Sequence, residues 1–135
     1  MYQNNLKDQT MSNNQKYYIY VGQLRKEFAK SKKAKLKNEN PDPEKHGLYV
    51  GYSSKEPKVR WRQHLKKERN SKGPLFSRVA AKWGENYIHW RKFKDINPIS
   101  SKNKAKKLER EIAIKYRDKG FATWSDALPY LESEN

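Results

Sequence analysis

The alternation of apolar and polar residues predicts two short strands in the first half of the chain. Residues 17–22 (YYIYVG) are aromatic and β-branched, and residues 47–51 (GLYVG) form a second apolar run. Successive side chains of a strand point to opposite faces, so Tyr18 and Tyr20 would share one face of the first strand. Pairing of the two strands would place Tyr20 beside Tyr49, although tyrosine also favours strands for packing reasons alone.

Helical patterns fill most of the second half. A helix over residues 57–68 begins with a proline, which suits the first helical position. A second helix is predicted over residues 74–84, where apolar residues recur at helical spacing until a glycine ends the pattern. The longest helix is expected over residues 101–119, between a serine that can cap it and Gly120.

Two further segments complete the predicted sheet. Residues 87–93 (YIHWRKF) alternate as a third strand, and residues 121–124 (FATW) are compatible with a short last strand. The pattern therefore predicts a small α+β domain with an antiparallel sheet of about three strands and about three flanking helices. Its expected divisions are a polar tail at 1–15, a domain at 16–125 with a lysine-rich insertion at 23–46, and a C-terminal extension at 126–135.

The charge of the chain indicates which class of partner it binds. The 135 residues include 31 Lys and Arg against 15 Asp and Glu, a formal net charge of +16. A polyanion is the natural partner, and nucleic acid is favoured because aromatic residues that can stack on bases lie among the cations, namely Trp61, Trp83, Trp90 and Tyr87. The alternative is a lysine-rich surface that serves solubility only.

Composition also excludes several classes of site. The chain has no cysteine, so it has no disulfide, no thiolate zinc site and no cysteine nucleophile. No apolar run approaches the ~20 residues that cross a bilayer, and the N-terminal residues lack an apolar signal segment. An intracellular protein of the cytoplasm or the nucleoid is expected.

One carboxylate falls on the apolar side of the longest predicted helix. Ala105, Leu108, Ile112 and Tyr116 form a single apolar stripe, and Glu109 lies within about 40° of its centre. A buried carboxylate is costly unless it is paired with a cation or bound to a metal. Glu109 could therefore form a structural salt bridge, or it could bind a hard divalent cation such as Mg²⁺.

A cationic pair precedes it in the sequence. Arg60 and His64 are four residues apart in the predicted 57–68 helix, so they share one face, while Trp61 and Leu65 share the apolar side. Such a pair is common on the surface of basic helices. It indicates a catalytic role only in combination with the predicted tyrosine strands.

In combination, these motifs resemble the GIY-YIG nuclease family. The first family motif matches YIY at residues 18–20, with tyrosine in place of the motif's glycine, and the second matches YVG at residues 49–51. The segment RWRQH supplies the family's helical arginine and histidine as Arg60 and His64, and the glutamate helix places Glu109 at the metal position. The resemblance spans most of the chain, but the tyrosine motifs are further apart than in the family, and its downstream asparagine has no evident counterpart after the glutamate helix.

The resemblance implies hydrolysis of DNA phosphodiester bonds with Mg²⁺ or Mn²⁺. Glu109 would bind the metal, and Arg60 would offer its donor fork to the phosphate. Tyr20 or Tyr49 would orient or deprotonate the attacking water, provided that nearby cations favour the phenolate, and His64 would relay the proton.

The basic side chains expected to contact double-stranded or branched DNA are Lys32, Lys33, Lys35, Lys37, Lys58, Arg62, Lys66 and Lys67. An alternative function is a non-catalytic nucleic-acid-binding module, derived from the same fold or an unrelated small basic protein. A partner-binding adaptor would require an exposed apolar patch, which the sequence does not indicate.

Overall fold

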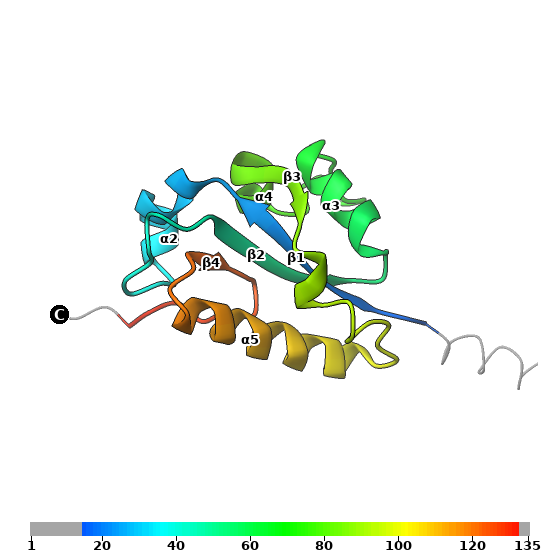
Figure 1. Cartoon of the computed structure of the whole chain (residues 1–135). Coiled ribbons are helices and arrows are strands. Elements are labelled where there is room, and N and C mark those ends of the chain that lie inside the picture. The colour runs from blue at the N-terminus through cyan, green and yellow to red at the C-terminus, as the bar shows by residue number, and fades with distance from the viewer. Residues whose placement is uncertain (1–14, 133–135) are drawn as a thin grey trace, which may run out of the picture.

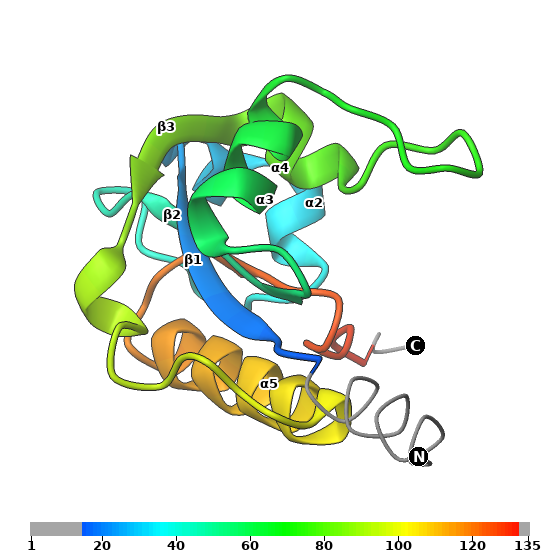
Figure 2. The ribbon, with the colours of Figure 1, turned by 90° about the vertical axis from the view of Figure 1, so that its right-hand side faces the viewer.

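Helices cover both faces of one sheet in the computed structural model, which describes residues 15–132. Residues 1–14 of the predicted tail lie outside the described residues. Figure 1 shows α5 (Lys102–Asp118) along one face of the sheet, with α3 (Pro57–Leu65) and α4 (Arg78–Trp83) on the other side. Figure 2 separates the same layers from the side. The predicted α+β class is confirmed.

The sheet differs from the predicted three-stranded antiparallel one. It is mixed and has four strands in the order β3-β1-β2-β4. Strand β1 (Tyr18–Leu24) pairs antiparallel with both β2 (Gly47–Ser53) and β3 (Gly84–Ile88). Strand β4 (Thr123–Trp124) runs parallel to β2, because the chain first crosses a face of the sheet as α5 and then returns to the β2 edge.

The alternation along the hairpin sorts its side chains as predicted. Tyr20 pairs with Gly51 and Tyr49 with Gly22, so the two tyrosines lie on the same face, where Trp61 of α3 packs beside both rings. The aliphatic side chains take the opposite face, which α5 covers, and they are fully buried: Ile19, Val21, Leu48 and Val50.

The two shorter helices are briefer than predicted. Helix α3 ends at Leu65 and not at Glu68, and Lys67 has a positive φ of 58° that no helix accommodates. Helix α4 begins only after Ser77, because the Ser77 hydroxyl accepts a hydrogen bond of 3.1 Å from the Ala80 amide and caps the helix. Within residues 15–132, no helix has the length and apolar character that a bilayer span requires.

The predicted strand at 87–93 is wrong in its second half. Strand β3 starts directly where α4 ends and stops at Ile88. The chain then forms a 3₁₀ turn at Trp90–Lys92, and this turn brings Phe93 into the core with 1% of its surface exposed. Burial of that single phenylalanine outweighs the local alternation that favoured a strand.

The predicted lysine-rich insertion is part of the packed fold. Its first residues complete β1, a 3₁₀ turn follows at Lys26–Lys30, and a short helix, α2, spans Lys32–Lys35. The buried Asn38 side chain then donates to the Thr123 carbonyl oxygen and accepts from the Thr123 amide, both at 2.9 Å. These two bonds tie the segment to β4.

Candidate active site

Two tyrosines of the hairpin and a histidine of α3 form a buried cluster. The Tyr20 hydroxyl and Nε2 of His64 are 2.8 Å apart and share a hydrogen bond. The ring centroid of Tyr49 lies 6.0 Å from that of Tyr20 and 5.2 Å from that of His64. All three side chains are buried. The fold thus brings together three of the five residues predicted for the catalytic site.

Local sequence explains why these side chains meet. Gly51 lies opposite Tyr20, and a Cβ at Gly51 would lie 2.6 Å from the Tyr20 hydroxyl oxygen, so the glycine leaves room for the phenol. After β2 the chain turns, and Pro57 begins α3. Trp61 and His64 follow one turn apart and are the buried side chains of this helix that face the tyrosines.

Arg60 is held beside this cluster by two side chains that the sequence did not single out. Its Nε donates a 3.1 Å hydrogen bond to the Ser53 hydroxyl, and its guanidinium carbon lies 4.1 Å from the centroid of the Phe76 ring. The charge of Arg60 opposes the burial that raises the pKa of Tyr20, and it adds to the burial that lowers the pKa of His64. A fixed cation therefore acts directly on the phenol–imidazole pair.

Burial sets the protonation of the cluster. It raises the pKa of Tyr20 well above its usual value near 10, and this effect exceeds the opposing effect of Arg60. Burial also raises the pKa of Tyr49, and it lowers the pKa of His64 to about 4. At neutral pH both phenols are protonated and the imidazole is uncharged. The condition that nearby cations favour the phenolate is not met.

Glu109 is the buried carboxylate predicted on α5. It is 5% exposed, and its Oε2 accepts a 2.9 Å hydrogen bond from the Ser125 hydroxyl. Burial raises its pKa to about 7, and the charge of Asp126 adds to the increase. Among the described residues, no salt bridge joins Glu109 to a Lys or Arg, so the structural ion-pair explanation is not supported.

The Glu109 carboxylate lies close enough to the tyrosines for their charges to interact. Its negative charge raises the pKa values of Tyr20 and Tyr49, and Asp126 has the same effect on both. Sequence reasoning missed Ser125 and Asp126, which directly follow β4, because only the pairing of β4 with β2 brings them to the site.

The carboxylate oxygens of Glu109 and Asp126 are of the type that binds a hard divalent cation. No group of three or more His, Asp or Glu side chains with metal-site spacing occurs within residues 15–132. Mg²⁺ needs only one or two protein carboxylates when water and substrate phosphate complete its shell. Glu109 and Asp126, whose charges interact, could supply such a donor set, although burial is the main cause of the raised pKa of Glu109.

The chain matches no model of a protein family, no curated protein and no solved structure. The chemistry of the site is therefore inferred from its own geometry and motifs. In that geometry, Tyr20, Tyr49 and His64 are in contact, Arg60 is adjacent to them, and Glu109 interacts through its charge.

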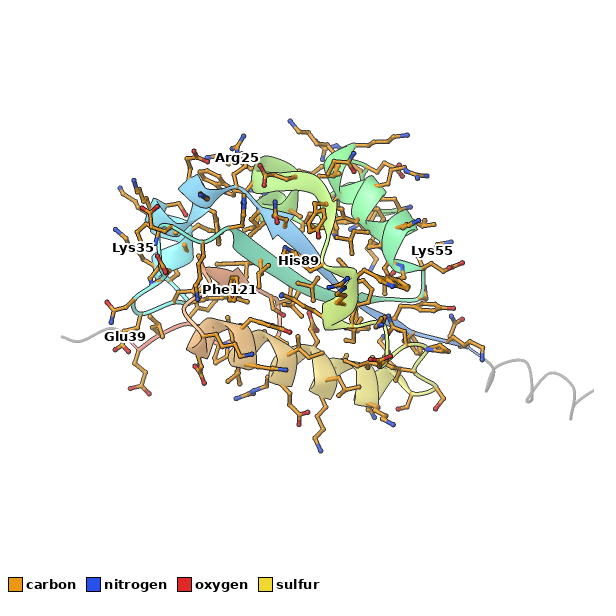
Figure 3. All side chains as sticks on the ribbon, in the orientation of Figure 1. Arg25, Lys35, Glu39, Lys55, His89 and Phe121 are labelled. Atoms are coloured by element: carbon orange, nitrogen blue, oxygen red, sulfur yellow. The ribbon has the colours of Figure 1, made fainter. Side chains whose placement is uncertain are left out.

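The predicted DNA-contacting cations fall into two groups. Figure 3 shows Lys35 and Lys55 at opposite ends of the sheet. Lys35 belongs to α2, and Lys55 lies just before α3. The exposed members of the two groups are Lys32, Lys33 and Lys35 on α2, and Lys58, Arg62, Lys66 and Lys67 on or after α3.

Lys37 differs from the other predicted cations because it is buried. Its Nζ donates a 2.8 Å hydrogen bond to the Ser125 carbonyl oxygen and lies 4.1 Å from the centroid of the Trp124 ring. Its ammonium group thus holds the segment after β4 in place instead of facing a phosphate.

The raised pKa of Glu109 predicts a pH-dependent stability difference. A carboxyl group with a pKa of about 7 when folded, against an ordinary value of 4.5, destabilises the fold as pH rises through that interval. In divalent-free buffer, Glu109→Gln should therefore gain about 3 kcal/mol of unfolding free energy relative to wild type between pH 4.5 and 7. Denaturant titrations at several pH values measure this difference, and parallel curves for the two proteins would contradict it.

The comparison must be a difference between the two proteins because other groups titrate in the same interval. The pKa values of His64 and His89 are lowered to about 4, mainly by burial. Both histidines therefore cost stability as pH falls from 6.5, which is the opposite trend to Glu109. Their contribution is common to wild type and Glu109→Gln and cancels.

Proposed function

We propose that this chain is a metal-dependent endonuclease that hydrolyses DNA phosphodiester bonds through a GIY-YIG-type site. The observation that carries the proposal is the buried 2.8 Å contact between the Tyr20 hydroxyl and His64 Nε2, with the charge of Arg60 acting on both groups. The net charge of +16 supports DNA as the substrate.

The phenol–imidazole pair is suited to move a proton without forming a separate phenolate. The Tyr20 oxygen takes a proton from the attacking water as its own hydroxyl proton moves to His64 Nε2, which leaves hydroxide to attack, Tyr20 still protonated and His64 as imidazolium. This relay requires Nε2 to be the unprotonated ring nitrogen, which agrees with an uncharged imidazole at neutral pH. The charge of Arg60 favours proton donation by Tyr20, although burial is the larger effect on its pKa, and the same charge disfavours protonation of His64.

Arg60 is also the group placed to bind the phosphate. Its Nε donates to Ser53, and the two terminal nitrogens of the guanidinium, which have no hydrogen-bond partner within residues 15–132, could make a bidentate contact with phosphate oxygens. Such a contact strengthens as negative charge grows on the phosphate in the transition state.

Glu109, with Asp126 beside it, would hold Mg²⁺ or Mn²⁺. The bound metal would polarise the phosphodiester and stabilise the charge of the leaving oxygen. The Ser125 hydroxyl orients the Glu109 carboxylate by donating to Oε2.

Removal of the Tyr20 hydroxyl tests the relay. Tyr20→Phe should lower the rate of DNA cleavage by about 100-fold or more, because the water loses its proton acceptor while the ring packing is retained. Single-turnover cleavage rates give the measurement. Tyr17→Phe, a change on the opposite face of the same hairpin, is the control and should cleave at the wild-type rate; equal rates for all three proteins would remove Tyr20 from the mechanism.

The proposed function itself is tested on the wild-type protein. Supercoiled plasmid and a panel of branched DNAs are incubated with Mg²⁺, Mn²⁺ or EDTA, and nicked products are separated on gels. Cleavage with either metal and none with EDTA supports the nuclease. Tight, salt-sensitive binding without cleavage in any metal would instead support a non-catalytic nucleic-acid-binding module, for which the charge alone is sufficient.

A further inference from the structure

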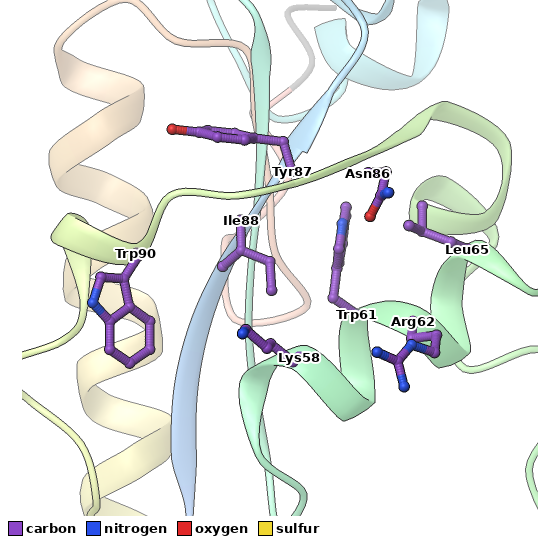
Figure 4. Close-up of a pocket in the computed structure, with 8 residues that line it drawn as sticks. All are labelled: Lys58, Trp61, Arg62, Leu65, Asn86, Tyr87, Ile88 and Trp90. Carbon is purple, nitrogen blue, oxygen red and sulfur yellow. The ribbon is translucent and has the colours of Figure 1, made fainter.

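A pocket lies beside the active-site cluster, between α3 and β3. Its volume is about 600 Å³, within the range of roughly 300–1,000 Å³ that is usual for small-ligand sites. Figure 4 shows Trp90 on one side of the hollow and Trp61 and Leu65 on the other, with Ile88 between them. Its walls are thus largely apolar and aromatic.

Two aromatic side chains at this pocket are unusually exposed. Tyr87 is 54% exposed and Trp90 is 55% exposed. Trp90 makes an edge contact with Phe93 at 5.4 Å between ring centroids, while Tyr87 contacts His89 at 4.9 Å on the other side of β3 (Figure 4). The exposed Trp90 ring offers a flat surface on which another ring can stack.

The charge around the pocket points to an anion. Lys58 and Arg62 line it from α3 and are exposed, and no carboxylate is among the described residues that line it. A ligand that joins a flat ring to a negative group matches both the aromatic walls and the cationic rim. A nucleotide of a nucleic-acid strand has this chemistry.

We propose that this pocket binds an unpaired nucleotide of the DNA, with its base against Trp90 and its phosphate at Lys58 and Arg62. The pocket adjoins the cluster because Trp61 lines the pocket and also packs beside the catalytic tyrosine rings. The inference rests on the proposed function in taking DNA as the ligand, and it assigns a preference for DNA with single-stranded segments.

Equilibrium binding in EDTA tests the pocket separately from cleavage. Fluorescence anisotropy compares wild type and Trp90→Ala on a blunt duplex and on the same duplex with a single-stranded overhang. Wild type should bind the overhang DNA more tightly, and Trp90→Ala should lose roughly tenfold on the overhang DNA with little change on the blunt duplex. Tyr130→Ala, which truncates an aromatic side chain that is 61% exposed outside the pocket, is the control and should bind both DNAs like wild type.

A second probe reports stacking directly. 2-Aminopurine placed in the overhang should be quenched on binding to wild type and less so on binding to Trp90→Ala. Equal losses on both DNAs, or unchanged affinity in Trp90→Ala, would overturn the proposal. A wild-type dimer that Trp90→Ala converts to a monomer, with overhang binding unchanged, would also overturn it and assign the pocket to self-association. Because no metal is present, loss of cleavage in other experiments does not affect these outcomes.

Discussion

Glu109→Gln is expected to lower metal-dependent DNA cleavage by about a thousandfold or more, while DNA binding in EDTA stays unchanged. Glutamine has the shape of glutamate and its amide oxygen can still accept the hydrogen bond from Ser125. It cannot supply the negative charge that a divalent cation requires. The loss should therefore fall on metal binding and catalysis, and titration of Mg²⁺ against cleavage rate measures it.

A matched control separates this effect from a general change of charge. Glu111 lies on the same helix but is exposed, so Glu111→Gln makes the same chemical change away from the site. It should cleave at the wild-type rate. Glu109→Gln should also be at least as stable as wild type at pH 8, because it removes a buried charge, so unfolding cannot explain its inactivity. Cleavage by Glu109→Gln at the wild-type rate would assign Glu109 a structural role only.

The parts of the fold that were predictable from the sequence are those with a local cause. The two tyrosine strands follow from period-two alternation, and α5 follows from its apolar stripe between Ser101 and Gly120. The same stripe predicts that Glu109 points into the protein, and the burial of Glu109 confirms this prediction. Residues that share a strand or helix face are fixed by backbone geometry alone.

The parts that could not be predicted depend on contacts distant in sequence. The parallel pairing of β4 with β2 is invisible in a two-residue strand, yet it delivers Ser125 and Asp126 to Glu109. The burial of Lys37 likewise depends on Trp124, far along the chain, since an isolated lysine-rich segment predicts only exposed side chains.

The protonation of the site is also a tertiary property. The mechanism implied by the sequence resemblance required nearby cations to favour the phenolate of Tyr20 or Tyr49. The packing around the hairpin removes water from the hydroxyl, and this desolvation dominates the charge of Arg60. The proposed mechanism therefore uses a hydrogen-bonded relay through His64 in place of a free phenolate.

The largest effect on stability is expected at the tryptophan that supports the cluster. Trp61 is 1% exposed, and its indole N–H donates a 2.8 Å hydrogen bond to the Glu85 carbonyl oxygen. Trp61→Ala should lower the free energy of unfolding by about 3–5 kcal/mol, because it opens a cavity under both tyrosine rings. Denaturant unfolding measures the loss, and a decrease below about 1 kcal/mol would contradict the view that Trp61 is central to the core.

A substitution at Gly22 tests whether the absence of a side chain there makes room for the Trp61 ring. A Cβ at Gly22 would lie 2.4 Å from the Trp61 ring, closer than any real contact, so Gly22→Ala should cost about 1–3 kcal/mol in the wild-type background. In the Trp61→Ala background the ring is absent, and the same change should cost little, because the new methyl group enters the cavity. A double-mutant cycle from four unfolding curves measures this coupling, which should fall between about 0.5 and 3 kcal/mol. If the two losses are additive, the cost of Gly22→Ala does not come from a clash with the Trp61 ring. Gly22 would then be needed for a different reason.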